Sequence, residues 1–553
     1  MTEIGGGRLV IETLKKAGVE TIFGLHGAHI DPLFQACLDE NVKIVDTRHE
    51  VAAGHAAEGY ARATGRLGVA MVTAGPGFTN VVASMANAYL DRTPVLYLSG
   101  ANGLSGAETN TLQAGIDQVA IARPVTKWAH QVTRTEQLPR LVAQAIRIAM
   151  TPPTGPVLLD LPMDVLGARI DAASVEPAHR LTLDIAAEPS SGSIAAILEK
   201  LAKAERPVLL LGGHWPADAA AAVTKLAETT STPVYTDFFA HGLLPASHPL
   251  HGGTTHKMAD LKDTPPDLIL ALGIRFGLFT LGTLPHLIPH GAEIIHVDTD
   301  GRELGRIRSA DLALLADPAA TASALAEAAS TRSWPDRNAW VNRIATCRTE
   351  RKRLAAADLE AVNPPLHPYQ AVTAIAEALD DDTIVVGDGA EAYHWLNEVI
   401  ARDHPHHYIT HGFLGCVGMG LGLAIGAASS RADASVLALA GDGAVGFTLA
   451  EFDTMARHNL PITVVVMNNQ SWAASQHFQE LAVGRNRVVG TQLSGARYED
   501  AAKALGCTGV YIDRAADLTP AIRAALASRK PTCINVAIDL APLPPELHLL
   551  MAR

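Results

Sequence analysis

The stretch GDGAVGFTLAEFDTMARHNLPITVVVMNN, residues 441–469, decides the fold. The apolar run ASVLALA before it predicts a buried strand that ends at a Gly-Asp-Gly turn. We expect Thr448 and Glu451 to form a capping box at the start of a helix, and ITVVVM to form the next strand. Because a crossover helix returns the chain parallel to the first strand, Asp442 and Asn469 should meet at one edge of a sheet.

Asp442 and Asn469 carry the chemistry of this unit. A carboxylate, an amide oxygen and a main-chain carbonyl beyond Asn469 make an all-oxygen site, which suits a hard cation such as Mg²⁺ with water and substrate phosphates in its other positions. Each element is common in α/β folds, but the combination at this spacing predicts a metal site that anchors phosphates.

Composition excludes several classes of protein. The chain has 553 residues, 48% of them hydrophobic, which is enough for several packed domains and argues against disorder. It has no apolar run of about 18 residues and no signal-peptide pattern. A net charge of −13 disfavours nucleic acid as a partner. The five scattered cysteines favour a reduced, cytoplasmic protein.

Short apolar runs alternate with helical patterns in three segments, which predicts an α/β fold of three doubly wound parallel-sheet domains. We expect the domains at 1–180, 190–345 and 360–553, with linkers around 171–193 and 355–370. The second segment lacks GxGxxG after its first strand, so no cofactor is expected there. The predicted strands are ETIFGL, VKIVDT, LGVAMVTAG, TPVLYLSG, GPVLLDLP, RPVLLLGG, TPVYTD, DLILALG, EIIHVD, DTIVVGDG, ASVLALAGDG, PITVVVMNN and PTCINVAID.

The GDG-to-NN unit closely resembles the motif of thiamine diphosphate (ThDP) enzymes. The resemblance implies a pyrimidine-binding first domain, a central domain and a diphosphate-binding third domain. It also implies that Asp442, Asn469 and the carbonyl of Ser471 hold Mg²⁺, which binds the cofactor's diphosphate. In this superfamily the site lies between the first domain of one subunit and the third domain of another, so a homodimer, usually assembled into a tetramer, is implied.

Glu50, in VKIVDTRHEVAAGHAAEG, follows a predicted strand. Alone it fits the first turn of a helix, where a carboxylate interacts well with the helix dipole. By resemblance it is the acid that acts on the aminopyrimidine ring, and partial burial would raise its pKa. TAGPGFTN has glycines that would let the backbone approach that ring. The cofactor-binding residues implied by the resemblance are Glu50, Gly75, Gly77, Asn80, Gly389, Ala390, Gly415, Val417, Asp442, Gly443, Ala444, Asn469, Ser471 and Trp472.

Within the family, GLHGAHIDPLFQACLDE, TNTLQAGIDQVA, ITHGFLG and MNNQSWAASQHF resemble the benzaldehyde lyases, over nearly the whole chain. This implies reversible cleavage of (R)-benzoin-type 2-hydroxyketones into two aldehydes, with ThDP and Mg²⁺. A neutral imidazole near pH 7 is a suitable base for the substrate hydroxyl. The resemblance assigns proton transfer to His29 and substrate hydrogen bonding to Gln113, although a lone histidine is more often structural. The implied pocket residues are Ala28, Met163, Tyr393, His411 and Phe413.

Three positions depart from the benzaldehyde lyase pattern. Met163 stands where those enzymes have tryptophan, which alters the aryl-binding wall. Phe413 replaces a tyrosine, and Val417, the apolar wedge under the cofactor, replaces a methionine. The preferred aldehyde therefore stays open.

Three alternative functions also remain open. A 2-oxo acid decarboxylase or acetolactate synthase shares fold and cofactor, but Ala28 offers no hydroxyl to a substrate carboxylate. A 2-hydroxyacyl-CoA lyase breaks the same kind of bond, and the C-terminal PLPPELHLLMAR carries only one basic residue for a CoA site. An inactive scaffold is disfavoured by the presence of Glu50, Asp442 and Asn469.

Overall fold

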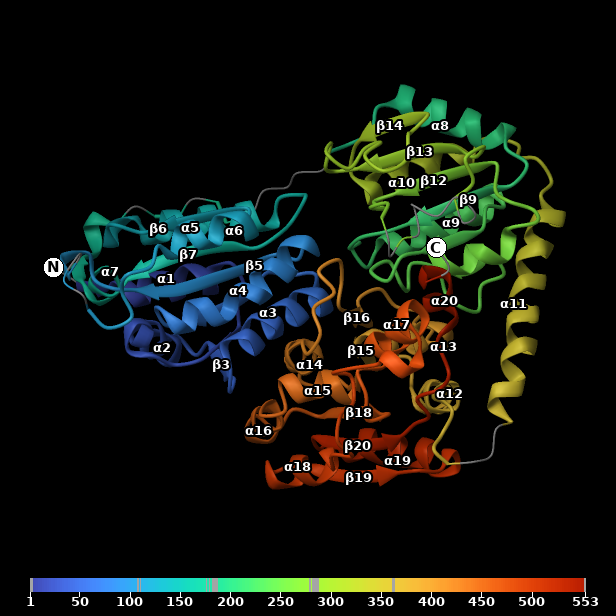
Figure 1. Cartoon of the computed structure of the whole chain (residues 1–553). Helices are drawn as coiled ribbons and strands as arrows, with labels where there is room; N and C mark the ends of the chain where they lie inside the picture. The colour runs from blue at the N-terminus through green and yellow to red at the C-terminus, as the bar shows by residue number, and fades with distance from the viewer. Residues whose placement is uncertain are drawn as a thin grey trace.

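The computed structural model describes residues 3–551, apart from 107, 108, 110, 176, 179, 182–186, 278, 279, 281–287 and 361–363. It contains three α/β domains, each built around a six-stranded parallel sheet (Figure 1). The first domain forms one side of the molecule, and the central and C-terminal domains lie together on the other. The predicted fold class is thus confirmed.

The N-terminal sheet has the strand order β3-β2-β4-β5-β7-β6. Its inner strands β2, β4, β5 and β7 are buried along their whole length, because helices cover both faces. A short antiparallel pair, β1 (Glu3–Gly5) and β8 (Arg169–Asp171), closes the domain. The strands are β2 (Thr21–Gly24), β3 (Lys43–Asp46), β4 (Gly68–Val72), β5 (Val95–Ala101), β6 (Trp128–Gln131) and β7 (Val157–Pro162). The helices are α1 (Gly6–Lys16), α2 (Asp31–Glu40), α3 (Glu50–Thr64), α4 (Pro76–Leu90), α5 (Gln118–Ala122), α6 (Leu138–Met150) and α7 (Met163–Gly167).

The C-terminal sheet has the order β16-β15-β17-β18-β20-β19. When the six strands of each sheet are numbered in chain order, the N-terminal and C-terminal sheets both have the strand order 2-1-3-4-6-5. The two domains therefore share one topology. The strands are β15 (Ile384–Asp388), β16 (Tyr408–Thr410), β17 (Val436–Gly441), β18 (Ile462–Asn468), β19 (Thr508–Ile512) and β20 (Thr532–Ala537). The helices are α12 (Pro368–Ala378), α13 (Ala390–Val399), α14 (Gly420–Ala428), α15 (Asp442–Phe447), α16 (Glu451–Arg457), α17 (Ala473–Val483), α18 (Tyr498–Ala504), α19 (Ala515–Ser528) and α20 (Pro545–Met551).

The central sheet differs, with the order β11-β10-β9-β12-β13-β14, or 3-2-1-4-5-6 along the chain. This is the strand order of dinucleotide-binding folds. The strands are β9 (Pro207–Leu211), β10 (Val234–Thr236), β11 (His251–Thr254), β12 (Leu268–Leu272), β13 (Glu293–Asp298) and β14 (Leu312–Leu315). The helices are α8 (Ser191–Lys203), α9 (Ala219–Thr230), α10 (Pro318–Ala329) and α11 (Asn338–Leu359).

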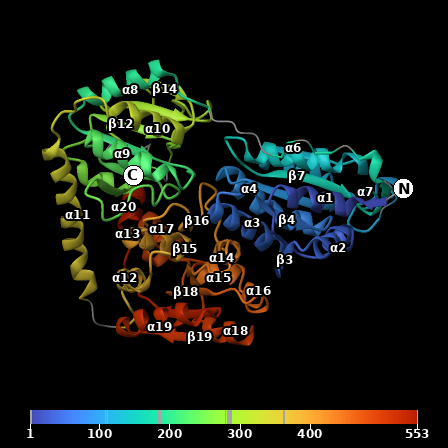
Figure 2. The same cartoon turned by 180° about the vertical axis from the view of Figure 1, so that it is seen from behind.

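Helix α11 links the central and C-terminal domains. In Figures 1 and 2 it runs from the central domain along the side of the molecule toward α12. It spans residue 345, where the sequence placed the end of the central domain, and covers the first part of the linker expected at 355–370. Residues 361–363 of that linker, and several within 171–193, lie outside the described part of the chain.

The capping box predicted at Thr448 and Glu451 is wrong. The Thr448 hydroxyl donates to the carbonyl of Gly418 at 3.1 Å, and α16 has Ala450 at its N-cap with no side-chain cap bond. The Glu451 carboxylate instead accepts from the backbone N–H of Arg48 in the N-terminal domain, at 3.1 and 3.2 Å. A tertiary contact therefore replaces the local one.

Helices α3 and α14 hold the N- and C-terminal domains together. Small residues allow this contact, because a Cβ on Gly426 would lie 1.9 Å from the Ala56 carbonyl and one on Gly59 would lie 2.2 Å from the Leu423 carbonyl. The Ala- and Gly-rich helix that follows Glu50 is thus used for close packing inside the chain (Figure 1). No helix among the described residues is long and apolar enough to cross a membrane.

Candidate active site

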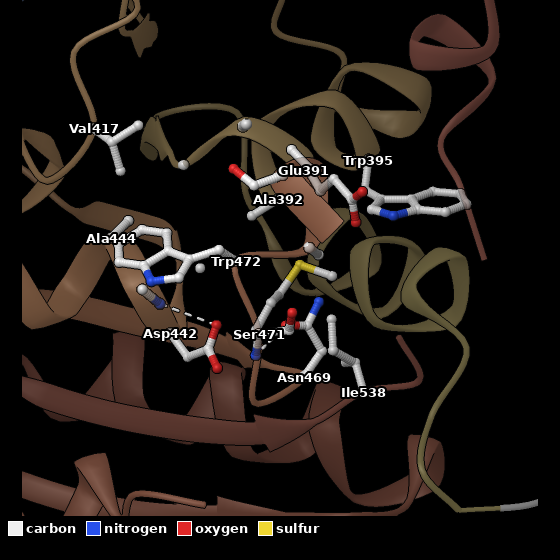
Figure 3. Close-up of a pocket in the computed structure, with 18 residues that line it drawn as sticks. Glu391, Ala392, Trp395, Val417, Asp442, Ala444, Asn469, Ser471, Trp472 and Ile538 are labelled. Atoms are coloured by element: carbon white, nitrogen blue, oxygen red, sulfur yellow. Dashed lines mark hydrogen bonds between the residues drawn. The ribbon is translucent and has the colours of Figure 1, made fainter. Parts of the chain in front are cut away.

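A cavity of about 130 Å³ opens at the carboxyl edge of the C-terminal sheet. It lies beside β17 and β18, which are neighbouring parallel strands with Gly441 opposite Met467. Figure 3 shows Asp442, Asn469 and Ser471 together on one side, and Glu391 and Trp395 across from them. The lining residues are Gly389, Ala390, Glu391, Ala392, Trp395, Val417, Gly441, Asp442, Gly443, Ala444, Met467, Asn469, Ser471, Trp472, Ala473, Ala474, Ser475 and Ile538. The βαβ unit thus brings its two ends together as predicted.

Asp442 is the charged residue expected to bind the metal. Its side chain is 2% exposed, and its Oδ2 atom has no hydrogen-bond partner. Burial raises the pKa of this carboxyl to about 6, although the backbone N–H groups of Gly443, Gln470 and Ser471 oppose the shift. A buried carboxylate oxygen without a donor is costly unless a cation compensates it. The residue therefore fits a role as a Mg²⁺ ligand.

Asn468 and Asn469, at the turn after β18, have different roles. Asn468 is structural, since its amide donates to the Ala496 carbonyl and to the Asn535 side chain. Asn469 lines the cavity, and its Oδ1 atom accepts from the Ser471 N–H at 3.2 Å. Gln470 between them has φ +60, which turns the chain so that Asn469 and Ser471 both border the cavity. Neutral oxygen donors beside Asp442 suit a hard cation.

Asp388, at the end of β15, shapes the wall near α13 and was not identified from the sequence. Its buried carboxylate accepts from the N–H groups of Gly389, Gly418 and Gly420, at 2.6, 3.1 and 2.7 Å. These bonds fix the loop that carries Gly415 and Val417, and Val417 lines the cavity. Gly389 caps α13 with φ +85, so the backbone N–H groups at the start of that helix face the site, as anion binding needs.

Glu391 is a second residue that sequence reasoning missed. It lines the cavity and pairs with His477 of α17, with 2.5 Å between Oε1 and Nδ1. Burial raises the pKa of Glu391, and the hydrogen bond to Glu391 raises the pKa of His477. The pair ties α17, which follows the Asn469 turn, to α13.

The N-terminal sheet carries a second group of predicted residues at its carboxyl edge. Glu50 is the first residue of α3, is 9% exposed, and accepts from the Asn80 amide at 3.0 Å. Its predicted burial is confirmed. His29 is 8% exposed and its Nδ1 lies 3.2 Å from the Thr73 hydroxyl. A Cβ on Gly77 would lie 3.6 Å from Glu50 Oε1, so this glycine is beside the acid.

Gln113 lies beside Gly75, because a Cβ on Gly75 would be 2.9 Å from Gln113 Cβ. Both residues have positive φ, +64 and +63. Gln118 positions this turn, since its Oε1 accepts from the Gly75 N–H at 2.8 Å and its amide donates to Asp160. Gln118 was not identified from the sequence. Ala28 is exposed, and Met163 is 45% exposed.

Three of the predicted pocket residues pack elsewhere in this chain. Tyr393 and His411 are buried with ring centroids 4.7 Å apart, and neither lines the cavity around Asp442. Burial lowers the pKa of His411 to about 4, so its imidazole is neutral. Phe413 lies under the Arg275 guanidinium of the central domain, 3.7 Å from the ring centroid. Their substrate roles stay predictions.

Glu451 connects the two groups of residues. The cavity around Asp442 is lined from residues 389–538 only, whereas Glu50 and His29 belong to the N-terminal sheet. Glu451 is 1% exposed and binds the backbone just before Glu50 through the Arg48 N–H. It follows Asp442 closely in the chain and so ties the metal-site unit to the start of α3.

Comparison with known families agrees with this geometry. Three models match in order: the N-terminal TPP binding domain of thiamine pyrophosphate enzymes over residues 4–121, the central domain over 194–325, and the C-terminal TPP binding domain over 388–536. The chain belongs to the thiamine pyrophosphate enzyme family. Its cofactor is thus ThDP, with Mg²⁺ as the usual partner metal of the family.

Full-length relatives include two kinds of enzyme. The acetolactate synthase large subunit IlvG of Mycobacterium tuberculosis is 32% identical over 541 residues, covering 96% of this chain and 95% of the relative. The acetolactate synthase large subunit of Lactococcus lactis is 30% identical, covering 98% and 95%. Human 2-hydroxyacyl-CoA lyase 2 is 31% identical, covering 92% and 85%. The similarity thus supports ThDP-dependent carbon–carbon chemistry and is not specific to benzaldehyde lyases.

Proposed function

We propose that this enzyme cleaves the carbon–carbon bond beside the hydroxyl of 2-hydroxycarbonyl compounds, which releases aldehydes. It also catalyses the reverse reaction, which forms this bond. The resemblance to benzaldehyde lyases makes benzoin-type 2-hydroxyketones the candidate substrates. The relatives support the alternatives more directly, namely a 2-hydroxyacyl-CoA lyase, which acts on the same kind of bond, or an acetolactate synthase.

The observation that carries the lyase proposal is the setting of His29. Its Nδ1 is engaged by the Thr73 hydroxyl, so proton transfer with a substrate would use Nε2. Bond cleavage requires the substrate hydroxyl to lose a proton, and a buried imidazole at the sheet edge can accept it. Gln113, beside Gly75, would orient the substrate without adding charge.

The cofactor fits the remaining residues. ThDP, when bound, supplies a site that takes up the electron pair of the breaking bond. Asp442, Asn469 and the Ser471 carbonyl would hold the metal, and the backbone at Gly389 and Ala390 would face the diphosphate. Glu50 would exchange a proton with the aminopyrimidine ring, and Asn80 keeps its carboxylate oriented.

A substrate panel tests the proposal. Metal-free apoprotein is assayed for aldehyde release from (R)-benzoin and an aliphatic 2-hydroxyketone, with and without ThDP and Mg²⁺. Parallel reactions measure carbon dioxide release from pyruvate and aldehyde release from a 2-hydroxyacyl-CoA. Cleavage of a hydroxyketone only with both cofactors supports the proposal. Turnover of pyruvate or the acyl-CoA alone would assign the enzyme to the corresponding alternative.

We also propose that the complete site forms between two copies of the chain, Glu50 from one and Asp442 from the other. A mixture of Glu50→Gln and Asp442→Ala proteins, each inactive alone, tests this after the subunits exchange. Random pairing would restore one intact site in half of the dimers, giving roughly a quarter of wild-type activity. Sites contained within one chain would stay inactive in every pairing.

A further inference from the structure

Cys416 occupies a short loop beside the cofactor cavity. It lies between Gly415, with φ +64, and Val417, which lines the cavity. Gly418, with φ +89, ends the loop and is held by Asp388 and by the Thr448 hydroxyl. The side chain of Cys416 is partly exposed in the single chain. A change at its sulfur would therefore act on a segment that borders the cofactor.

A buried histidine points at this sulfur from the N-terminal domain. His55 of α3 is 2% exposed, and its Nε2 lies 4.0 Å from Cys416 Sγ. Its Nδ1 makes no hydrogen bond but lies 3.6 Å from Oε2 of Glu58, which is fully buried. Cys416, His55 and Glu58 thus form a sulfur–imidazole–carboxylate series across the domain contact.

The charges around His55 favour its protonated form. Burial opposes that form, but the bond to Cys416 and the Glu58 carboxylate outweigh it and raise the pKa of His55 to about 9. The other charged groups that face this position are Arg62, 3.9 Å from Glu58, and the buried Asp388. The imidazole ring thus lies within reach of the sulfur, and the thiolate is the reactive form of cysteine.

The other four cysteines lack this setting. They are 0 to 8% exposed, and burial raises the pKa of each of their thiols: Cys37, Cys347, Cys507 and Cys533. They are therefore inert by the usual criteria of burial and thiol form. The chain supplies its own internal controls.

We propose that Cys416 is a peroxide-sensitive modification site that controls cofactor binding. The thiolate attacks hydrogen peroxide, a sulfur–oxygen bond forms as the oxygen–oxygen bond breaks, and the products are a sulfenate and water. Two equivalents of a small thiol return the sulfenate to the thiol and leave a disulfide and water. The added oxygen crowds His55 and displaces the loop that carries Val417. Cofactor binding weakens as a result.

Labelling of the full-length enzyme tests the reactivity first. Substoichiometric iodoacetamide is followed by peptide mass spectrometry, with the folded protein and the protein in urea compared. We expect Cys416 to react faster in the folded protein than in urea. In the folded protein, it should also react at least about tenfold faster than the four buried cysteines. His55→Gln should remove this advantage. A Cys416 that reacts no faster folded than in urea overturns the proposal.

Cofactor binding tests the consequence. After peroxide treatment, the affinity for ThDP at fixed Mg²⁺ should fall by at least about tenfold, as expected when a well-packed wall is overfilled, and dithiothreitol should restore it. Cys416→Ser should bind ThDP as tightly as the untreated wild type does, and peroxide should not change this affinity. Equal losses in the wild type and in Cys416→Ser would show that oxidation acts elsewhere.

Discussion

Replacing Gly443 with alanine should weaken cofactor binding while leaving the fold intact. A Cβ at this position would lie 2.5 Å from Cζ3, 2.6 Å from Cε3 and 2.8 Å from Cη2 of Trp472. Ordinary carbon–carbon contact needs about 3.5 Å or more, so the indole must move by about 1 Å. Because Trp472 lines the cavity, this movement changes the space that the cofactor needs.

The expected cost follows from overpacking. Forcing a methyl group into a filled site costs about 1–3 kcal/mol, which corresponds to roughly 5–150-fold weaker ThDP binding if the cofactor requires the original indole position. Alanine also favours a helix over glycine by up to about 1 kcal/mol, so the melting temperature of the apoprotein should change little. Calorimetric titration of ThDP at saturating Mg²⁺ measures the affinity directly.

Gly446 provides the matched control. It lies in the same helix, α15, and a Cβ there would meet no atom within 4 Å. Gly446→Ala should bind ThDP like the wild type and melt slightly higher. If Gly443→Ala binds ThDP as tightly as Gly446→Ala does, Trp472 does not set the shape of the cofactor site and the reasoning fails.

Four further variants are expected to have separable effects. Glu50→Gln should abolish turnover while calorimetry still detects ThDP binding, and substantial residual activity would remove the acid role. His29→Ala should lower the kcat of cleavage with little change in ThDP affinity; loss of binding would make it structural. Glu451→Gln should lower the melting temperature by weakening a buried charge-assisted bond to the Arg48 N–H, worth about 1–3 kcal/mol. Glu546→Gln should lower the melting temperature near neutral pH. Burial opposes ionisation of Glu546, but His394 and His256 outweigh it and lower the pKa of this carboxyl to about 2. Its contribution to stability is therefore present above the ordinary glutamate pKa and is lost as the pH falls toward 2. The two melting curves should therefore converge in acid, and a constant difference would contradict this.

The fold could be predicted from the sequence except at the sheet margins. All thirteen predicted runs are strands, and the five parallel strands that were missed, β6, β11, β14, β16 and β19, all lie at sheet edges. Inner strands are buried on both faces and read as continuous apolar runs. An edge strand such as β14 alternates between partly buried and exposed residues, and β11 contains two glycines, so neither shows that pattern.

The site could be predicted where one local unit builds it. Asp442 and Asn469 belong to a single βαβ crossover, so their meeting follows from the handedness and direction of the strands. Asp388, Gln118 and Glu451 bind backbone N–H groups of other segments. No sequence spacing encodes such partners, because any loop can present an N–H. Glu451 was misassigned for this reason, since its local spacing from Thr448 fitted a cap.

The sheet topologies explain where the functional residues lie. In both outer domains the order 2-1-3-4-6-5 reverses between the first and third strands, and ligands bind at such switch points. His29 and Gly75 follow β2 and β4, and Gly389 and Asp442 follow β15 and β17. Each half of the proposed cofactor site would thus use the same place in the fold.

The central sheet has its switch point between β9 and β12, and the third residues beyond these strands are His214 and Arg275. Both bind the N-terminal domain: the His214 ring contacts the Asp91 carbonyl at 3.0 Å, and Arg275 donates to the carbonyl of Leu90. Asp237, after β10, accepts a hydrogen bond from the Gly213 N–H at 3.1 Å. The position that binds a nucleotide in other sheets of this order therefore holds a turn of the neighbouring domain. In this chain the central domain uses its switch point to fix the orientation of the sheet that carries Glu50 and His29.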